Sequence, residues 1–404
     1  MSAQPNRGNR IALLLVVLSA AAAAGEARVA GSNATDIDVL LRNAVEQKRV
    51  PMVVAMVADA NRVVYEQALG VDKDAIFAIA SMTKPVTSVA VMQLVESGRV
   101  KLDDPAATYV PELATIRVRE RATLRAPKSA PTVRQLLTHT AGFAYEFLNR
   151  EAADAVAKKE VPSAFGGGEG FLKAPLVFDP GTHWQYGINT DWLGRLVERV
   201  SGRTLDGYFR EKIFAPLGMA DTFFVVPPDK QRRMVKTFQR NADGSLVEPP
   251  PRPTTTVEFF SGGGGLFSTA QDYLTFSRAI MAGGELGGRR ILSKASIEAM
   301  GRNQIGELTI GPFTSLVPQL MVPHVELSGI DKFGLGFALN SRPLPGGRGA
   351  NTMSWAGIFN TFFWIDREKQ IAAVFMTQML PFMDPGAATT IGEFDRAVYA
   401  WRNP

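Results

Sequence analysis

The chain has 404 residues, of which 46% are hydrophobic and 21% charged, a composition that is ordinary for a globular enzyme. This length predicts one large α/β domain or two lobes rather than a single small core. The absence of cysteine excludes disulfides, a thiolate nucleophile and cysteine-ligated zinc. The net charge of +5 is small for this size and the basic residues are scattered, so we expect no nucleic-acid partner.

The N-terminal residues 1–27 have the pattern of a secretory signal peptide. Two arginines are followed by an uncharged apolar run from Ile11 to Ala24 and then by small residues. The run is too short for a comfortable membrane span, so we expect cleavage after Ala24 or Ala27, with an uncleaved anchor as the alternative. The sequence therefore predicts a periplasmic or secreted protein, whose mature part, residues 28–404, has no stable membrane insertion.

The first hundred residues predict a helix, two strands and a second helix. Apolar residues recur at helical spacing over 34–49, and the runs Val53–Ala58 and Arg62–Gln67 are typical of strands joined by a tight turn. Thr83–Glu96 is rich in valine, alanine, methionine and leucine, which indicates a buried helix. Pro85 falls in its first turn, where a missing N–H is tolerated.

Residues 99–255 have a different pattern, in which helical segments alternate with glycine-rich and proline-rich loops. Such loops are unfavourable for the strands of a sheet. Strand patterns return only in the last third of the chain. The later expected elements are helices at 269–282, 293–301 and 390–401 and strands at 334–339, 352–356, 361–366 and 370–378. We therefore expect an α/β lobe, about 34–98 and 256–404, closed by both ends of the chain, with a mostly helical lobe, about 99–255, inserted. The cleft between two such lobes is a natural active site.

The stretch Ser81-Met82-Thr83-Lys84 places a hydroxyl and an amine three residues apart at the start of the buried helix. Positions i and i+3 share a helix face, so one turn holds a nucleophile and a base within reach of each other. Burial disfavours an ammonium ion, which lets the amine accept the serine proton. The alternative is a serine helix cap followed by an exposed lysine.

Two further motifs supply the groups that such a site needs. Tyr186 is the candidate for passing the proton to the leaving atom, although a lone tyrosine is more often a core residue with a bonded hydroxyl. Trp355-Ala356-Gly357 is expected on or entering a strand, where the glycine lets a substrate approach the backbone. The amide of Ile358 is then expected to form an oxyanion hole with the amide of Ser81. The alternative is an aromatic core strand with a bulge.

Together these motifs resemble the class C β-lactamase-like serine hydrolases, and within them the esterase branch known as family VIII carboxylesterases. The resemblance covers about residues 36–400. Its supporting stretches are Leu136–Gly142, Thr190–Gly194, Gly262–Ser268 and Thr361–Asp366. It implies an antiparallel sheet flanked by helices plus a mostly helical lobe. It also implies Ser81 as the acyl-accepting nucleophile, Lys84 as its base, Tyr186 as the proton relay, and neither metal nor organic cofactor.

Two departures separate this sequence from the β-lactamases of that family. Where they carry Tyr-x-Asn, the third position here is Ile188 and the asparagine follows at Asn189, turned by about 100° on a helix. Where they carry Lys-Thr-Gly, this chain has Trp355-Ala356-Gly357, and an indole packs against apolar groups rather than binding a carboxylate by charge. Both departures favour neutral ester substrates.

The sequence thus predicts a serine hydrolase that cleaves carboxylic esters, with short chains favoured, through an acyl-enzyme. A β-lactamase or an enzyme acting on D-alanyl-D-alanine peptides is the alternative within enzymes. The alternative outside enzymes is a catalytically silent binding protein, which would not react with a fluorophosphonate at Ser81. The oligomeric state is not readable from the sequence.

Overall fold

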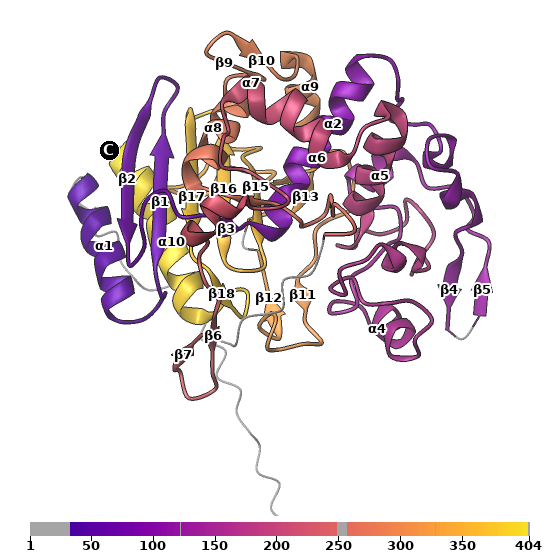
Figure 1. The fold of residues 1–404 in the computed structure, drawn as a ribbon, viewed down its shortest axis with the longest axis horizontal. Coiled ribbons are helices and arrows are strands. Elements are labelled where there is room, and N and C mark those ends of the chain that lie inside the picture. The colour runs from indigo at the N-terminus through magenta and orange to yellow at the C-terminus, as the bar shows by residue number, and fades with distance from the viewer. Residues whose placement is uncertain (1–32, 122, 249–256, 328, 403–404) are drawn as a thin grey trace, which may run out of the picture.

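The computed structural model describes residues 33–121, 123–248, 257–327 and 329–402, so the expected signal peptide at 1–27 lies outside the described residues. Its centre is a seven-stranded antiparallel sheet in the order β13-β14-β15-β16-β17-β1-β2 (Figure 1). The strands are β1 (Val53–Ala58), β2 (Val63–Leu69), β13 (Lys332–Phe333), β14 (Ala338–Leu339), β15 (Met353–Gly357), β16 (Thr361–Asp366) and β17 (Ile371–Met376).

The middle of the sheet joins the two ends of the chain. β1 and β17 are runs of small and branched apolar residues in which every residue is buried, as expected for strands covered on both faces. They pair antiparallel, with Ala55 opposite Phe375, and β2 follows β1 across a hairpin. The predicted sheet of N-terminal and C-terminal strands is thereby confirmed.

Helices cover both faces of this sheet. On one face lie α1 (Ala34–Glu46), which begins with a capping box from Asn33 and Asp36, and the C-terminal helix α10 (Pro385–Arg402). On the other face α8 (Ala270–Met281) packs on β17, β1 and β16, and α2 (Thr83–Glu96) lies beyond it (Figure 1). Alternate residues of β1 serve the two faces, which therefore have separate apolar cores.

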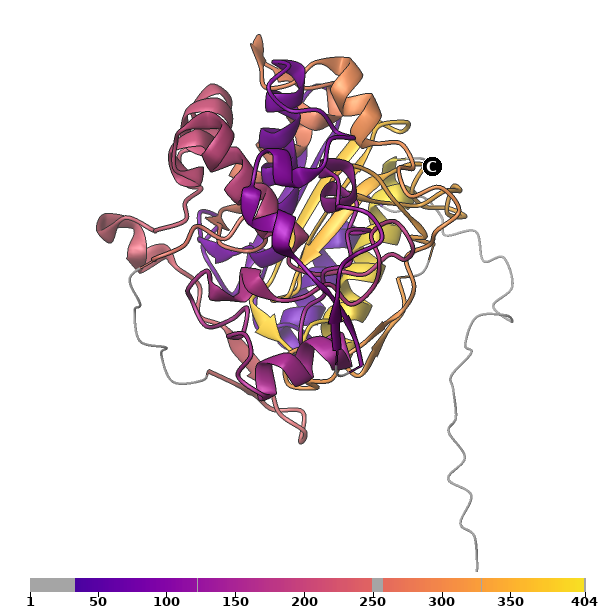
Figure 2. The ribbon, with the colours of Figure 1, turned by 90° about the vertical axis from the view of Figure 1, so that its right-hand side faces the viewer.

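The segment between β2 and β17 supplies the remaining elements, except β18, which follows β17. Figure 2 shows its indigo-to-magenta part lying in front of the sheet. Within it, α5 (Asn189–Ser201) packs against α2, which buries the polar start of both helices. The other helices are α3 (Val133–Leu137), α4 (Arg150–Ala157), α6 (Leu205–Phe209), α7 (Ala215–Leu217) and α9 (Lys294–Met300). The remaining strands are β3 (Phe77–Ala78), β4 (Val118–Glu120), β5 (Thr123–Arg125), β6 (Phe238–Arg240), β7 (Leu246–Val247), β8 (Phe267–Ser268), β9 (Glu285–Leu286), β10 (Arg289–Arg290), β11 (Phe313–Thr314), β12 (His324–Val325) and β18 (Met379–Leu380).

Three expectations from the sequence differ from the structure. The strand expected at 334–339 is a turn followed by the two-residue β14, because Gly336 has φ +91° and lies so close to Ser88 that a Cβ would meet the serine hydroxyl at 2.1 Å. The C-terminal helix begins earlier than 390, since Asp384 accepts hydrogen bonds from the first free amides of α10. The region 99–255 also contains the short hairpins β4–β5 and β6–β7.

Among the described residues, none of the helices combines the length and the hydropathy needed to cross a bilayer.

Candidate active site

Ser81 lies in a short turn between β3 and α2. β3 pairs with β8, and the amide of Ile79 donates to the carbonyl of Leu266, so the chain is held on both sides of the turn. Ala80, just before the serine, has φ +42°, a left-handed conformation that costs a non-glycine residue about 1–2 kcal/mol. Backbone strain of this kind gathers at functional positions, where the surrounding structure enforces it.

Lys84 lies one helical turn after Ser81, with 1% of its surface exposed. Its Nζ is 3.3 Å from Ser81 Oγ, as the i, i+3 spacing predicts. The same nitrogen is 3.0 Å from the hydroxyl of Tyr145 and donates to the carbonyl of Gly263 at 2.7 Å. Three oxygen contacts hold the amine in place, so a base for the serine hydroxyl is already positioned before any substrate binds.

Two tyrosines surround this amine. Tyr186, the residue expected from the sequence, stacks its ring 4.7 Å from Lys84 Nζ, and its hydroxyl accepts a hydrogen bond from Trp355 Nε1 at 3.3 Å. Tyr145 was not expected, yet it is the tyrosine whose hydroxyl contacts the amine directly. Burial raises the pKa of Tyr145 well above its ordinary value, so its phenol stays protonated. The structure therefore offers one tyrosine that holds Lys84 and one whose hydroxyl faces the cavity.

A buried carboxylate, that of Asp191, holds the loop that contacts Lys84. Asp191, in the first turn of α5, accepts hydrogen bonds from Ser261 Oγ at 2.6 Å and from the amide of Gly263 at 3.0 Å. Burial raises the pKa of Asp191, while the charge of Lys84 and these two hydrogen bonds act to lower it. The carbonyl of Gly263 also accepts a hydrogen bond from Lys84 Nζ. The Asp191 carboxylate therefore holds the loop that in turn positions the Lys84 amine. A Cβ on Gly263 would meet Asp191 Oδ2 at 2.4 Å, which explains the glycine there.

The Trp355-Ala356-Gly357 motif forms the end of β15 beside the nucleophile. A Cβ on Gly357 would meet the carbonyl of Ile79 at 2.4 Å, so glycine is required to press the strand against the turn that carries Ser81. The sequence suggests that a glycine at position 357 leaves room for a substrate. The structure adds that no larger residue would fit between β15 and the carbonyl of Ile79. Within the described chain, the amides of Ser81 and Ile358 donate no backbone hydrogen bond, which leaves both available to an oxyanion.

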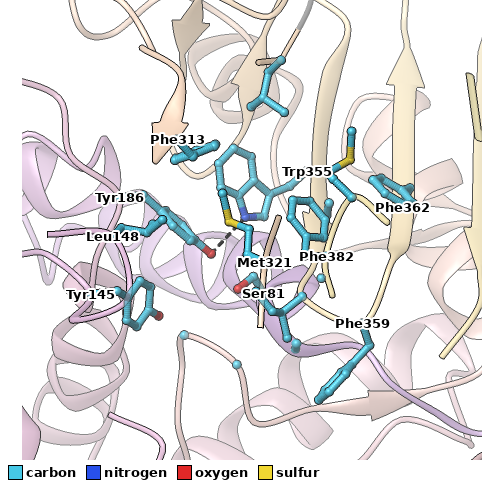
Figure 3. A pocket seen from close by; sticks show the side chains of 18 of the residues that line it. Ser81, Tyr145, Leu148, Tyr186, Phe313, Met321, Trp355, Phe359, Phe362 and Phe382 are labelled. Atoms are coloured by element: carbon cyan, nitrogen blue, oxygen red, sulfur yellow. Dashed lines mark hydrogen bonds between the residues drawn. The ribbon is translucent and has the colours of Figure 1, made fainter. Parts of the chain in front are cut away.

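These residues line a cavity of about 640 Å³, within the usual range for small-molecule sites. Figure 3 shows Ser81 at its floor, with Tyr145, Tyr186 and Phe313 on one side and Phe362 and Phe382 on the other. The lining is mostly aromatic and aliphatic, so an ester with bulky apolar groups would find contacts on both sides of the serine.

The sequence-predicted residues Ser81, Lys84, Tyr186, Trp355, Gly357 and Ile358 are all brought together here. Sequence reasoning missed the roles of Tyr145, Asp191 and Gly263. Tyr145 comes three residues after the Leu136–Gly142 stretch and no spacing relates it to Ser81. Asp191 and Gly263 stood within stretches that carried the resemblance, but only their contacts in the folded chain connect them to Lys84.

Comparisons with known proteins agree with this geometry. The family model described as Beta-lactamase matches residues 37–396. Lovastatin esterase of Penicillium rubens is 29% identical over 322 residues, covering 74% of this chain and 79% of that protein. Monacolin J acid methylbutanoyltransferase of Aspergillus terreus is 28% identical over 407 residues, covering 90% of this chain and 95% of that protein.

A solved structure, the LovD6 mutant of simvastatin synthase from Aspergillus terreus, matches with a TM-score of 0.79 at 26% sequence identity. The match covers 93% of this chain and 99% of that one. The resemblance and the β-lactamase-like fold predicted from the sequence are therefore confirmed, and the chain is similar to esterases and to acyltransferases alike.

Proposed function

The chain belongs to the β-lactamase family, and on that basis we propose that it is a serine carboxylesterase that works through an acyl-enzyme. One observation supports the proposal most directly: Lys84 Nζ lies 3.3 Å from the Oγ of Ser81, and Ser81 lines a mostly apolar cavity. A desolvated amine beside a serine hydroxyl is the arrangement that activates a serine without histidine.

In the proposed reaction, Ser81 Oγ attacks the ester carbonyl while Lys84 takes the hydroxyl proton. The amides of Ser81 and Ile358 donate to the oxygen that gains negative charge. Tyr186 passes a proton to the departing alkoxide, and a water molecule then attacks the acyl-enzyme to release the acid and restore Ser81. Short-chain esters, expected from the sequence, fit the cavity, and so do longer ones, so the acyl length stays a prediction.

The first test compares the protein with its Ser81→Ala variant on p-nitrophenyl acetate and on a chromogenic cephalosporin. We expect rapid ester cleavage, a loss of at least about 10³-fold in kcat/KM in the variant, and little cephalosporin turnover. Ser97→Ala, an exposed serine at the end of α2, is the control and should leave both rates unchanged. Near-normal ester cleavage by Ser81→Ala would refute the mechanism.

A β-lactamase remains the alternative, and two observations count against it. Asn189 is fully buried, its Nδ2 contacts His139 Nδ1 at 2.9 Å, and it is not among the residues that line the cavity, so its amide does not reach a substrate there. The indole of Trp355 donates to Tyr186 where a β-lactamase of this family would present a lysine. Dominant cephalosporin turnover in the same assay would reverse this ranking.

Acyl transfer to an alcohol is a second candidate. An aromatic cavity of about 640 Å³ accommodates an acyl group and an alcohol together, and its apolar lining disfavours water as the acceptor. Similarity to a methylbutanoyltransferase over most of the chain supports the same idea. Adding butanol to the p-nitrophenyl acetate assay tests it: butyl acetate as the main Ser81-dependent product would make transfer the leading function, and acetic acid alone would exclude it.

We also propose that the protein is exported through residues 1–27. N-terminal sequencing of the protein recovered from periplasm or medium should begin after Ala24 or Ala27. An intact N-terminus in the recovered protein would contradict cleavage.

A further inference from the structure

The cavity that contains Ser81 continues behind the strand that flanks it. Along β15, Trp355 pairs with Phe363 of the α2-side core. Ser354 and Ala356 alternate with it and pair with Trp364 and Phe362, which contact the α10-side core. Phe362 lies opposite Ala356 across the ladder, and Ile391 of α10 forms the other wall. These side chains line the same cavity as Ser81. A groove therefore runs from the nucleophile along the α10 face of the sheet.

The far end of this groove is polar. Arg348, in the loop before β15, has only 12% of its side chain exposed and lines the cavity. Its Nε donates to Asp395 at 3.1 Å, and its guanidinium stacks 4.6 Å from the centroid of the Trp364 ring. Trp364 is paired with Ser354 across the sheet. The serine therefore lies on the same face as the Trp364 ring and the Arg348 guanidinium that stacks on it.

Three donors at this end have no partner in the described part of the chain. Asp395 occupies only Nε of Arg348, which leaves Nη1 and Nη2 unpaired. The Ser354 hydroxyl, 96% buried on its residue, forms no hydrogen bond with another described residue. All three groups belong to residues that line the cavity, and none of them is sealed in the core, so they are open to a ligand that supplies acceptors.

We propose that Arg348 and Ser354 form a subsite for a carboxylate carried by the substrate. The two terminal nitrogens of a guanidinium match a carboxylate in a bidentate geometry, and the Trp364 ring and Asp395 hold that fork ready. The inference rests on the proposed esterase function and deepens it. The substrate class is a carboxylic ester with an apolar chain that ends in a second carboxylate. It differs from the neutral ester expected from the sequence, because the anion binds at Arg348 and not at the Trp355 position where the β-lactamases carry a lysine.

The length of that chain follows from the strand. Gly357, beside Ser81, lies three positions after Ser354, which corresponds to about 10 Å of strand. Roughly eight to ten carbons span this distance, since carbon–carbon bonds are ~1.5 Å long. Glu326, an acidic residue that also lines the cavity, is exposed, so water screens its charge from the bound anion.

The test uses two esters of equal length, the mono-p-nitrophenyl ester of decanedioic acid and its neutral terminal amide. The intact protein should cleave the carboxylate ester with a kcat/KM about tenfold higher or more. Arg348→Gln should abolish this preference, and Ser354→Ala should reduce it severalfold, while turnover of p-nitrophenyl acetate is unchanged in both. Arg342→Gln, an exposed arginine of the same loop, is the matched control and should keep the preference.

Equal rates on the two long esters, with normal acetate turnover, would overturn the subsite and leave the esterase function intact. A preference that survives in both folded variants would also overturn it, because the carboxylate would then be recognised elsewhere. Absence of any Ser81-dependent acetate turnover would instead refute the proposed function itself.

Discussion

The two faces of the central sheet are built in different ways, although both border the same cavity. On the α2 face, polar groups are buried and tied together: Lys84 contacts Ser81, Tyr145 and the loop that Asp191 holds. On the α10 face, the groove is apolar and its one guanidinium is paired on a single edge. The reaction requires fixed distances, which hydrogen bonds enforce. Binding of a long apolar chain depends mainly on the shape of the groove, with polar recognition confined to its far end.

The largest effect is expected on the α2 face, where removing the hydroxyls of Tyr186 and Tyr145 separately tests the role of each in the reaction. Tyr186→Phe should lower kcat on p-nitrophenyl acetate by about 10²–10⁴-fold with little change in KM, because the proton relay is lost. Tyr145→Phe should lower it by only about tenfold, the effect of one hydrogen bond to the amine. Steady-state kinetics on both variants gives the answer.

The opposite order of the two losses in kcat would exchange the roles assigned to Tyr186 and Tyr145. If Tyr145→Phe loses more activity than Tyr186→Phe, then the tyrosine that contacts Lys84 directly is the relay, and Tyr186 positions Trp355. Unfolding temperatures near that of the unmodified protein would ensure that the losses arise at the site.

A smaller effect is expected on the groove side. Ala388→Leu on α10 adds bulk to the groove wall, so kcat/KM for p-nitrophenyl decanoate should fall about tenfold relative to the acetate. Thr389→Leu places the same leucine side chain on the exposed side of the same helix and should change neither rate. An equal loss on acetate and decanoate would mean that the groove is not where the chain binds.

The smallest effect on turnover, none at all, is expected from a buried carboxylate away from the site, which acts on stability instead. Burial raises the pKa of Asp272 to about 6, although hydrogen bonds from the amide of Asp221 and the hydroxyl of Thr222 oppose the shift. The folded state therefore binds this proton more tightly than the unfolded chain, whose aspartates titrate near ~3.9. This contribution to stability is complete below about pH 4 and is lost as the pH rises through about 6.

Asp272→Asn has no such proton to lose. Relative to the unmodified protein, its free energy of unfolding should therefore gain roughly 2–3 kcal/mol between about pH 4 and pH 7. Urea unfolding at several pH values measures the difference. A constant difference across this range would show that Asp272 does not titrate as its burial implies, while ester turnover should be unaffected in either case.

What the sequence predicts well is local. Ser81 and Lys84 meet within one helical turn, and β1, β16 and β17 follow from short apolar runs, so neighbouring residues carry the signal. Tyr145 and Gly263 were missed because their contacts with Lys84 join segments far apart in the chain. Likewise, the shortening of β14 depends on the close approach of Gly336 to Ser88, which no local pattern reveals.

The position of β1 between β17 and β2 has a consequence for the timing of folding. During synthesis β1 and β2 emerge early, but their neighbour β17 is among the last segments to leave the ribosome. The turn that carries Ser81 likewise waits for β15, whose Gly357 closes on Ile79. Such long-range pairing makes folding slow and leaves apolar strands unpaired meanwhile. The site therefore assembles only once nearly the whole chain has been made, and a chain that ends before β17 gains no partial activity.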